Sequence, residues 1–179
     1  MTSALFSRRS FLASACIAAL AGPAQAELPL DPWAPRKLTG DERARLMAFR
    51  ERLGMAMRGA PADIRFVSDH VRLRFRLADL FANDRGKLTD RGLGTLTVLA
   101  EELHRERAVR AEITGHLHSG KSSYESYIAS RRNAVAVEAA LLSRGIPQPR
   151  LLATGLGEMF PIAGSPDLNH RVEILIRPL

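Results

Sequence analysis

The sequence predicts an α/β domain in which the order β-α-β-α-β-β builds one mixed sheet covered by helices, preceded by a short N-terminal helix. Three observations predict it. Apolar residues alternate with arginines over residues 71–77, recur at helical spacing over 93–103, and alternate again over 109–113 and 172–176. Alternation gives a strand one apolar face, and a period of three to four residues gives a helix an apolar stripe. Strands that alternate with helices favour a single sheet with the helices packed on it.

The chain begins with a predicted export signal. Residues 7–13 (SRRSFLA) hold two adjacent arginines followed by Phe-Leu, and a modest apolar run ends at the small-residue exit 24–26 (AQA). This pattern is typical of a twin-arginine signal cleaved before Glu27, which predicts a periplasmic location. An ordinary secretory signal or an uncleaved anchor is the alternative. The apolar run is short for a spanning helix, and Gly-Pro interrupts it at residues 22–23.

Cys16 is the only cysteine of the chain, and it lies inside this signal. Almost no apolar run precedes it and Ala13 stands three positions before it, so a lipid anchor is not expected. The chain after residue 26 has no thiol, which excludes disulfides, thiolate metal sites and cysteine nucleophiles there.

The charge balance is mildly basic. The formal net charge is +7, and it falls to +5 when the two signal arginines are removed. A mild charge spread along the chain is typical of a soluble surface. A basic surface also favours contact with anionic wall polymer or phospholipid headgroups. Aromatic residues are not interleaved with the basic ones, which argues against a nucleic-acid partner. No second apolar stretch is long enough to span a membrane.

A proline-rich stretch, residues 28–37, predicts an extended tether ahead of the first helix. Thr39 and Glu42 have the spacing of a capping box. The helix they start ends near Gly54, and its apolar stripe either packs on the main domain or binds a partner. We therefore predict three segments: the signal (1–26), the tether with its helix (27–62) and the main domain (63–179).

The first half of the main domain alternates strand, helix and strand. Residues 71–77 predict a strand with one apolar and one arginine face, and residues 82–86 have turn chemistry. Thr89 is predicted to cap the first helix of the domain. Residues 109–113 predict a second strand that runs into Gly115.

The second half adds a helix and two strands. The helix occupies about residues 124–143 and ends at Gly145. A short strand at residues 151–154 is followed by a loop rich in glycine and proline, and residues 172–176 form the last strand.

Several motifs of the main domain, in this order, resemble the peptidoglycan-binding domain of the OmpA, Pal and MotB family over Val71 to Pro178. Residues 113–116 (ITGH) stand where the family has its V-x-G-H/Y-T-D signature, and residues 152–158 (LATGLGE) are similar to its S-x-x-G-x-G-E loop. Residues 169–174 (NHRVEI) are close to its N-R-R-V-E-I ending. The further matches are Leu80, Phe81, Leu88, Ser130, Ala134, Gly145, Ile146, Pro147 and Pro161.

The resemblance implies a ligand site but also a change in it. In the family, an aspartate ends the G-H-T-D signature and an arginine follows fifteen residues on, and together they hold the diaminopimelate of the peptidoglycan stem peptide. The carboxylate pairs with the ligand's ammonium and the guanidinium with its carboxylate. An ungapped alignment places His118 at the aspartate and Asn133 at the arginine, while a shift of one residue would bring Arg132 there. The ligand-binding residues that the resemblance implies are Gly115, His116, His118, Arg132 or Asn133, Asn169 and Arg171.

The same loop also has sequence features of two other kinds of site, a phosphate-binding loop and a metal site. Residues 115–122 satisfy the phosphate-loop pattern G-x-x-x-x-G-K-S between a predicted strand and helix. No later strand ends in the metal-holding aspartate of such enzymes, so nucleotide hydrolysis is disfavoured. His116 and His118, with His170, have the residue type of a metal site. A family position for His116 and a polar pocket residue at His118 explain the first two better. We predict no catalytic residue, no metal and no cofactor.

These expectations combine into a function. We predict a non-catalytic periplasmic module that associates with peptidoglycan, peripheral to the cell wall or the outer membrane, with a divergent ligand pocket. The alternative is a fold repurposed as a protein-interaction or assembly component of the envelope that no longer binds diaminopimelate. The partner is thus the peptidoglycan stem peptide or an envelope protein.

Overall fold

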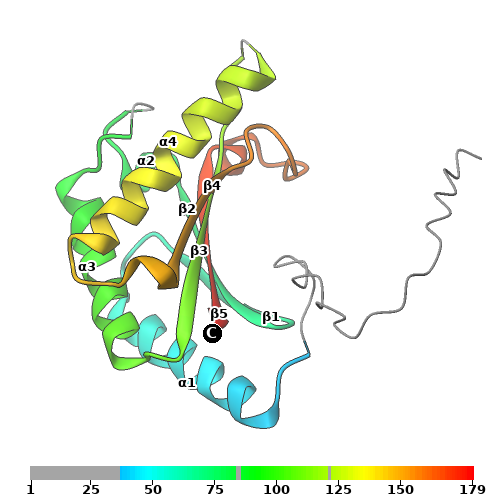
Figure 1. Cartoon of the computed structure of the whole chain (residues 1–179). Coiled ribbons are helices and arrows are strands. Elements are labelled where there is room, and N and C mark those ends of the chain that lie inside the picture. Colours follow the sequence, from blue (N-terminus) through cyan, green and yellow to red (C-terminus); the bar gives the residue numbers. More distant parts are fainter. Residues whose placement is uncertain (1–36, 84–85, 121) are drawn as a thin grey trace, which may run out of the picture. The chain divides into compact units, whose positions relative to one another are not determined.

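Five strands form one mixed sheet in the spatial order β1-β2-β5-β3-β4 in the computed structural model (Figure 1). Strands β3 and β4 run parallel, and the other neighbouring pairs are antiparallel. The strands are β1 (Asp63–Val67), β2 (His70–Arg76), β3 (Val109–His116), β4 (Leu151–Gly155) and β5 (Arg171–Pro178). The helices are α1 (Gly40–Ala56), α2 (Leu77–Leu80), α3 (Asp90–Arg105) and α4 (Ser123–Leu142), with 3₁₀ turns η1 (Gln148–Arg150) and η2 (Pro166–Asn169). The predicted fold class is confirmed.

The structure describes residues 37–83, 86–120 and 122–179. The predicted signal with Cys16, and the predicted tether up to residue 36, lie outside the described residues. Within these ranges no helix combines the length and the apolar character that crossing a membrane requires.

Strand β1 is an addition to the predicted order. It pairs antiparallel with β2 at the edge of the sheet, and the two-residue turn Ser68-Asp69 joins them. The sequence prediction missed it because the strand is five residues long and its turn lacks the Asn-Gly or Asp-Gly signal of a hairpin. Leu77, predicted as the last residue of the next strand, instead begins α2.

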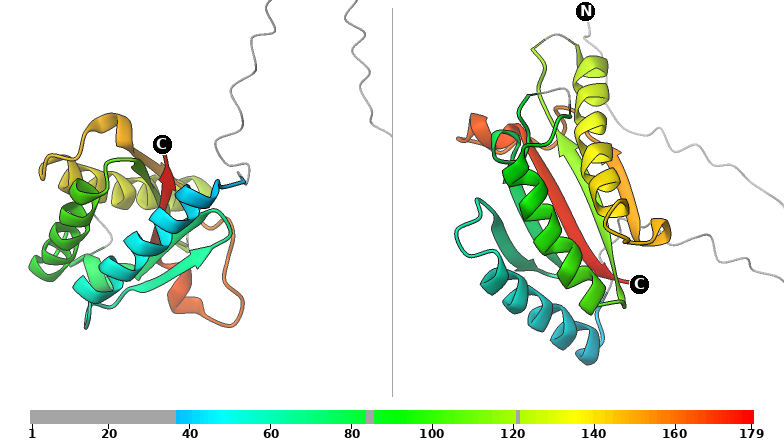
Figure 2. Two further views of the ribbon diagram at one scale, coloured as in Figure 1. Left: turned by 90° about the horizontal axis from the view of Figure 1, so that it is seen from below. Right: turned by 90° about the vertical axis from the view of Figure 1, so that its left-hand side faces the viewer.

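The helices α1, α3 and α4 cover one face of the sheet, as the right-hand view of Figure 2 shows. Helix α1 starts at the predicted capping box, in which Thr39 and Glu42 exchange side-chain to backbone hydrogen bonds. Its apolar stripe packs on the main domain. The stripe and the sheet share one core, to which Leu46, Phe49, Leu53, Val71, Leu73, Phe75, Leu96, Leu99, Ile113, Val137, Val172, Ile174 and Ile176 contribute fully buried side chains.

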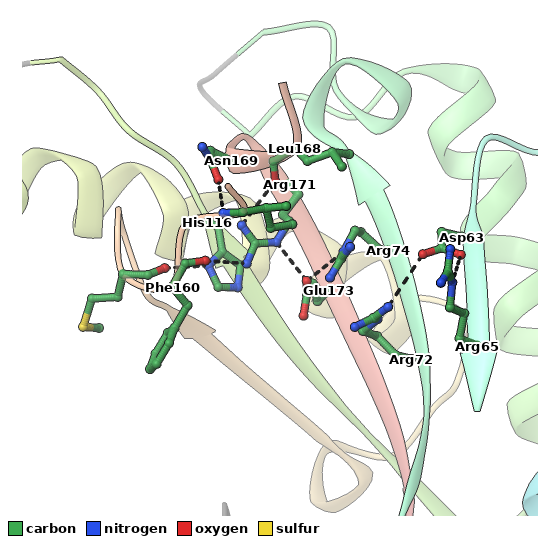
Figure 3. A network of polar contacts seen from close by, with 12 residues as sticks. Asp63, Arg65, Arg72, Arg74, His116, Phe160, Leu168, Asn169, Arg171 and Glu173 are labelled. Carbon is green, nitrogen blue, oxygen red and sulfur yellow. Dashed lines mark hydrogen bonds and ion pairs between the residues drawn. The ribbon is translucent and has the colours of Figure 1, made fainter. Parts of the chain in front are cut away.

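The opposite face of the sheet is polar, as the alternation in residues 71–77 predicts. Three carboxylates on this face each bridge two arginines. Glu173 lies 2.9 Å from Arg74 and 2.8 Å from Arg171 (Figure 3). The other two bridges are those of Asp63 with Arg65 and Arg72, and of Glu112 with Arg110 and Arg177.

Candidate functional site

The predicted motifs meet at one end of the sheet. His116, at the end of β3, pairs with Arg171 at the start of β5, and Gly115 pairs with Gly155 at the end of β4. The loop of residues 156–170 joins β4 to β5 and folds back on the segment after β3. Backbone hydrogen bonds of 2.9 Å from Leu156 N to Gly115 O and from Leu117 N to Gly157 O hold the two segments together. The fold therefore brings together motifs that are spread over about sixty residues of the sequence.

Helix α4 lies directly against the ends of β3 and β4 because glycines leave room for it. A Cβ atom on Gly115 would overlap the carbonyl oxygen of Ser130, and one on Gly155 would lie 2.6 Å from the backbone nitrogen of Arg131. The Ser130 hydroxyl also accepts a 2.9 Å hydrogen bond from Gly157 N. Gly115 thus serves close backbone packing in this structure.

Two backbone N–H groups of the loop after β3 already have hydrogen-bond partners and are not free to bind a phosphate. Leu117 N donates to Gly157 O, and Ser119 N donates to the Ser126 hydroxyl. Ser122 accepts from Glu125 N as the N-cap of α4, while Lys121 lies outside the described residues. Nothing in this arrangement favours nucleotide chemistry.

A pocket of about 370 Å³ opens where this loop meets the start of β5. We call it the loop pocket; its walls are His118, Gly157, Glu158, Met159, Pro161, Asn169, His170 and Arg171. Three of the residues predicted for the ligand site, His118, Asn169 and Arg171, line it. The other predicted residues lie outside its walls.

Glu158 is the carboxylate of the loop pocket. His118 Nδ1 donates to one of its oxygens at 2.6 Å, and the Ser123 hydroxyl donates to the other. These two hydrogen bonds, from Ser123 first and then His118, lower the pKa of Glu158, so the group is ionised at neutral pH. The sequence named Glu158 only as part of a motif, because its partner His118 is forty residues away. Glu125, which follows His118 by seven residues, instead caps α4 with Ser122.

Arg171 and its neighbours hold the loop rather than reach into solvent. Only 3% of Arg171 is exposed, and its guanidinium donates to Glu173, to Leu168 O at 3.2 Å and to Phe160 O at 3.1 Å (Figure 3). Asn169 accepts a 2.6 Å hydrogen bond from Ile162 N. These contacts fix the backbone of residues 160–169 around the pocket.

His116 supports the same loop from the sheet. Its ring is buried, and its Nδ1 lies 3.2 Å from the carbonyl oxygen of Met159. Burial, reinforced by the nearby Arg171 guanidinium, lowers the pKa of His116, so the neutral ring donates to this carbonyl at neutral pH. In the described part of the chain, no three His, Cys, Asp or Glu side chains are grouped to hold a metal ion.

The structure decides the register of α4. Asn133 is on the inner face of the helix with 0% exposure, and among the described residues neither the nitrogen nor the oxygen of its amide has a hydrogen-bond partner. Arg132 is exposed, and its Cγ lies 3.2 Å from where a Cβ on Gly86 would be. Neither side chain lines the loop pocket, so no arginine of α4 takes the place that the family resemblance implied.

Asn133→Leu is expected to raise the free energy of unfolding by about 1 kcal/mol, or the melting temperature by about 3 °C. A buried amide without partners is costly, and leucine has a similar volume. Thermal unfolding followed by circular dichroism measures the change. Ser130→Ala, on the same helix face, is the control and should lower stability because it removes the hydrogen bond from Gly157 N. A loss of stability in Asn133→Leu would mean that the amide has a partner.

The described residues thus form an α/β domain that carries a ligand-sized pocket on the loops at one end of its sheet. The chain belongs to the OmpA family, whose model matches residues 80–174.

Solved structures of related domains share the fold. A putative MotB-like protein from Desulfovibrio vulgaris is 23% identical with a TM-score of 0.64, covering 77% of this chain and 96% of that one. The cell wall anchor of the T6SS from Pseudomonas aeruginosa is 22% identical with a TM-score of 0.64, covering 77% and 100%. The periplasmic domain of Helicobacter pylori MotB (residues 78–256) is 17% identical with a TM-score of 0.59, covering 65% and 82%. At these identities the likeness establishes the fold.

Proposed function

We propose that this protein is a non-catalytic periplasmic module that associates with peptidoglycan through the loop pocket. The observation that carries the proposal is the Glu158 carboxylate, which lies 2.6 Å from His118. The family resemblance places His118 at the aspartate that holds the ammonium of the ligand. A carboxylate from a different loop therefore lies within hydrogen-bonding distance of the residue that stands at the position of the family aspartate.

Membership of the OmpA family supports a location at the cell envelope, and one structural relative is described as a cell wall anchor. Export by the twin-arginine route, with cleavage before Glu27, is part of the proposal. We also retain the division into a signal (1–26), a tether with its helix (27–62) and a main domain (63–179). Helix α1 then belongs to the second segment but packs on the core of the third.

The geometry of the pocket suits binding rather than catalysis. The Ser123 hydroxyl donates to Glu158 and not to His118, so serine and histidine are not arranged as a nucleophile and its base. Glu158 is ionised and can accept a further hydrogen bond from a ligand N–H or O–H. Arg171, His116 and Asn169 keep the surrounding loop in place before the ligand arrives, which lowers the cost of ordering on binding.

Co-sedimentation of the purified protein with diaminopimelate-type sacculi tests the proposal. We expect the wild-type protein to pellet and Glu158→Gln to bind about tenfold more weakly, because the variant loses a charge-assisted hydrogen bond. Glu101→Gln, on the exposed side of α3, removes the same charge elsewhere and should bind like wild type. A folded wild-type protein that stays in the supernatant would refute wall association.

The burial of Asn133 favours a second candidate, a protein-interaction or assembly component of the envelope. The resemblance implies that an arginine of α4 binds the carboxylate of diaminopimelate through two hydrogen bonds. No arginine of α4 lines the loop pocket, so this contact is not available there. Failure of the sacculus experiment would direct attention to protein partners.

A further inference from the structure

Phe160 has a strained backbone and an exposed side chain. Its φ is +58°, in the left-handed region that bulky residues avoid, and 69% of the residue is exposed. Such a conformation costs about 1–3 kcal/mol and persists only where the surroundings impose it. With so much of the ring in solvent, packing of the ring does not compensate for this cost.

Two buried polar side chains, Arg171 and His116, hold Phe160 in this backbone conformation. Arg171 donates to Phe160 O, and His116 donates to the preceding carbonyl, Met159 O. Figure 3 shows the Phe160 ring pointing away from this network. Hydrogen bonds to two successive carbonyl groups therefore fix the backbone at Phe160, while the Phe160 side chain remains exposed.

The two tyrosines of the chain lie beside the same loop. Tyr124 and Tyr127 are on the first turns of α4, with 73% and 39% of each residue exposed. The backbone nitrogen of Tyr127 is 3.0 Å from where a Cβ on Gly157 would lie, and Ser123 donates to Glu158. Tyr124 therefore follows the residue that binds Glu158, the backbone of Tyr127 lies next to Gly157, and Phe160 is two residues after Glu158. Exposed aromatic residues beside a polar pocket are typical of a ligand site.

The charges of the pocket indicate the kind of ligand. Glu158 accepts from His118 and Ser123, and Arg171 is paired with Glu173. A pocket whose charged walls are already paired favours a ligand without a full charge that offers hydroxyl and amide groups. N-acetylated sugar rings have this chemistry, and their apolar ring faces pack on aromatic side chains.

We propose that Phe160, Tyr124 and Tyr127 form a platform for the N-acetylated glycan strands of the cell wall, with Glu158 and His118 hydrogen-bonding to the sugar hydroxyl and amide groups. This inference rests on the proposed function, because it takes the cell wall as the ligand. It names the neutral glycan, rather than the charged stem peptide, as the part of peptidoglycan that these aromatic side chains recognise.

The test compares Phe160→Gly with Ser68→Gly. Ser68, in the turn between β1 and β2, also has a positive φ, +54°. Both variants relieve left-handed strain and are expected to melt at or slightly above the wild-type temperature. Phe160→Gly should bind peptide-free glycan strands about tenfold more weakly, which matches the contribution of one aromatic contact, and Ser68→Gly should bind like wild type. Phe160→Asn, a residue that tolerates the left-handed region, should also bind weakly, which separates loss of the ring from added flexibility.

Glycan strands released from sacculi by an amidase, and the free stem peptides from the same digest, are the two probes. Binding of strands by the wild-type protein, weakened in both Phe160 variants and not competed by stem peptides, supports the inference. Strands that bind Phe160→Gly as tightly as wild type, or that do not bind wild type, overturn it. Retention of the wild-type protein on intact sacculi decides the proposed function separately.

Discussion

Gly115→Ala is expected to lower the free energy of unfolding by about 3 kcal/mol, and the melting temperature by about 10 °C. Helix α4 crosses β3 at this glycine, and an added Cβ would overlap the carbonyl oxygen of Ser130. That oxygen belongs to the helix backbone and cannot move aside as a flexible side chain would. The helix must therefore shift, which disturbs the hydrogen bond between Ser130 and Gly157 at the loop pocket. Chemical denaturation measures the change.

Gly94→Ala is the matched control for this prediction. Gly94 is an exposed residue inside α3, and a Cβ there would meet no atom within 4 Å. The variant should be more stable than wild type by about 0.5–1 kcal/mol, because alanine loses less backbone entropy in a helix. Equal effects of the two substitutions would show that α4 does not approach β3 as closely as described.

Glu173→Gln is expected to cost about 3 kcal/mol at neutral pH. Glu173 bridges Arg74 and the almost fully buried Arg171, so the substitution leaves a buried guanidinium without its carboxylate partner. Burial by itself raises the pKa of Glu173, but the contacts with Arg171 and Arg74 outweigh it and hold the pKa below the usual glutamate range. The ion bridge is therefore stabilising in the folded state.

The pH dependence of this variant follows from the sign of the shift. Because the folded-state pKa is depressed, the contribution of Glu173 is fully present above the ordinary glutamate pKa of about 4.3 and is lost as pH falls through the lower, folded-state value. Urea unfolding at several pH values should show a large difference between wild type and Glu173→Gln at pH 7 that shrinks below about pH 4. Asp63→Asn is the control, since its ion pair with the exposed Arg65 is screened by solvent and should matter much less. A difference that is constant with pH would contradict the assignment.

The elements that the sequence predicted well are those with a local signal. The alternation in residues 71–77 corresponds to β2, with Val71, Leu73 and Phe75 buried. The capping residues Thr39 and Thr89 begin α1 and α3. In each case the signal lies within a few neighbouring residues, so it could be read without knowledge of the rest of the fold. Strand β1 has no such signal, because its stability comes from pairing with β2 and from packing under α1.

For the candidate site, too, the sequence identifies residues only where the motifs are local. Three of the residues that these motifs name, His118, Asn169 and Arg171, line the loop pocket. Glu158 was not singled out as the carboxylate of the pocket, because its hydrogen bond with His118 joins loops that follow two different strands. Arg171 was predicted to face the ligand, and its additional contacts with the loop backbone required the three-dimensional structure.

The sequence by itself determined the order of elements, the polar and apolar faces of the strands, and the resemblance to the OmpA family, since these depend on periodicity and on motifs in linear order. Only the tertiary structure decided which of Arg132 and Asn133 is buried. Successive helix residues point about 100° apart, so the answer depends on how α4 is rotated against the sheet. The close contacts at Gly115 and Gly155 fix that rotation, and they join residues that are 15 and 24 positions apart in the chain.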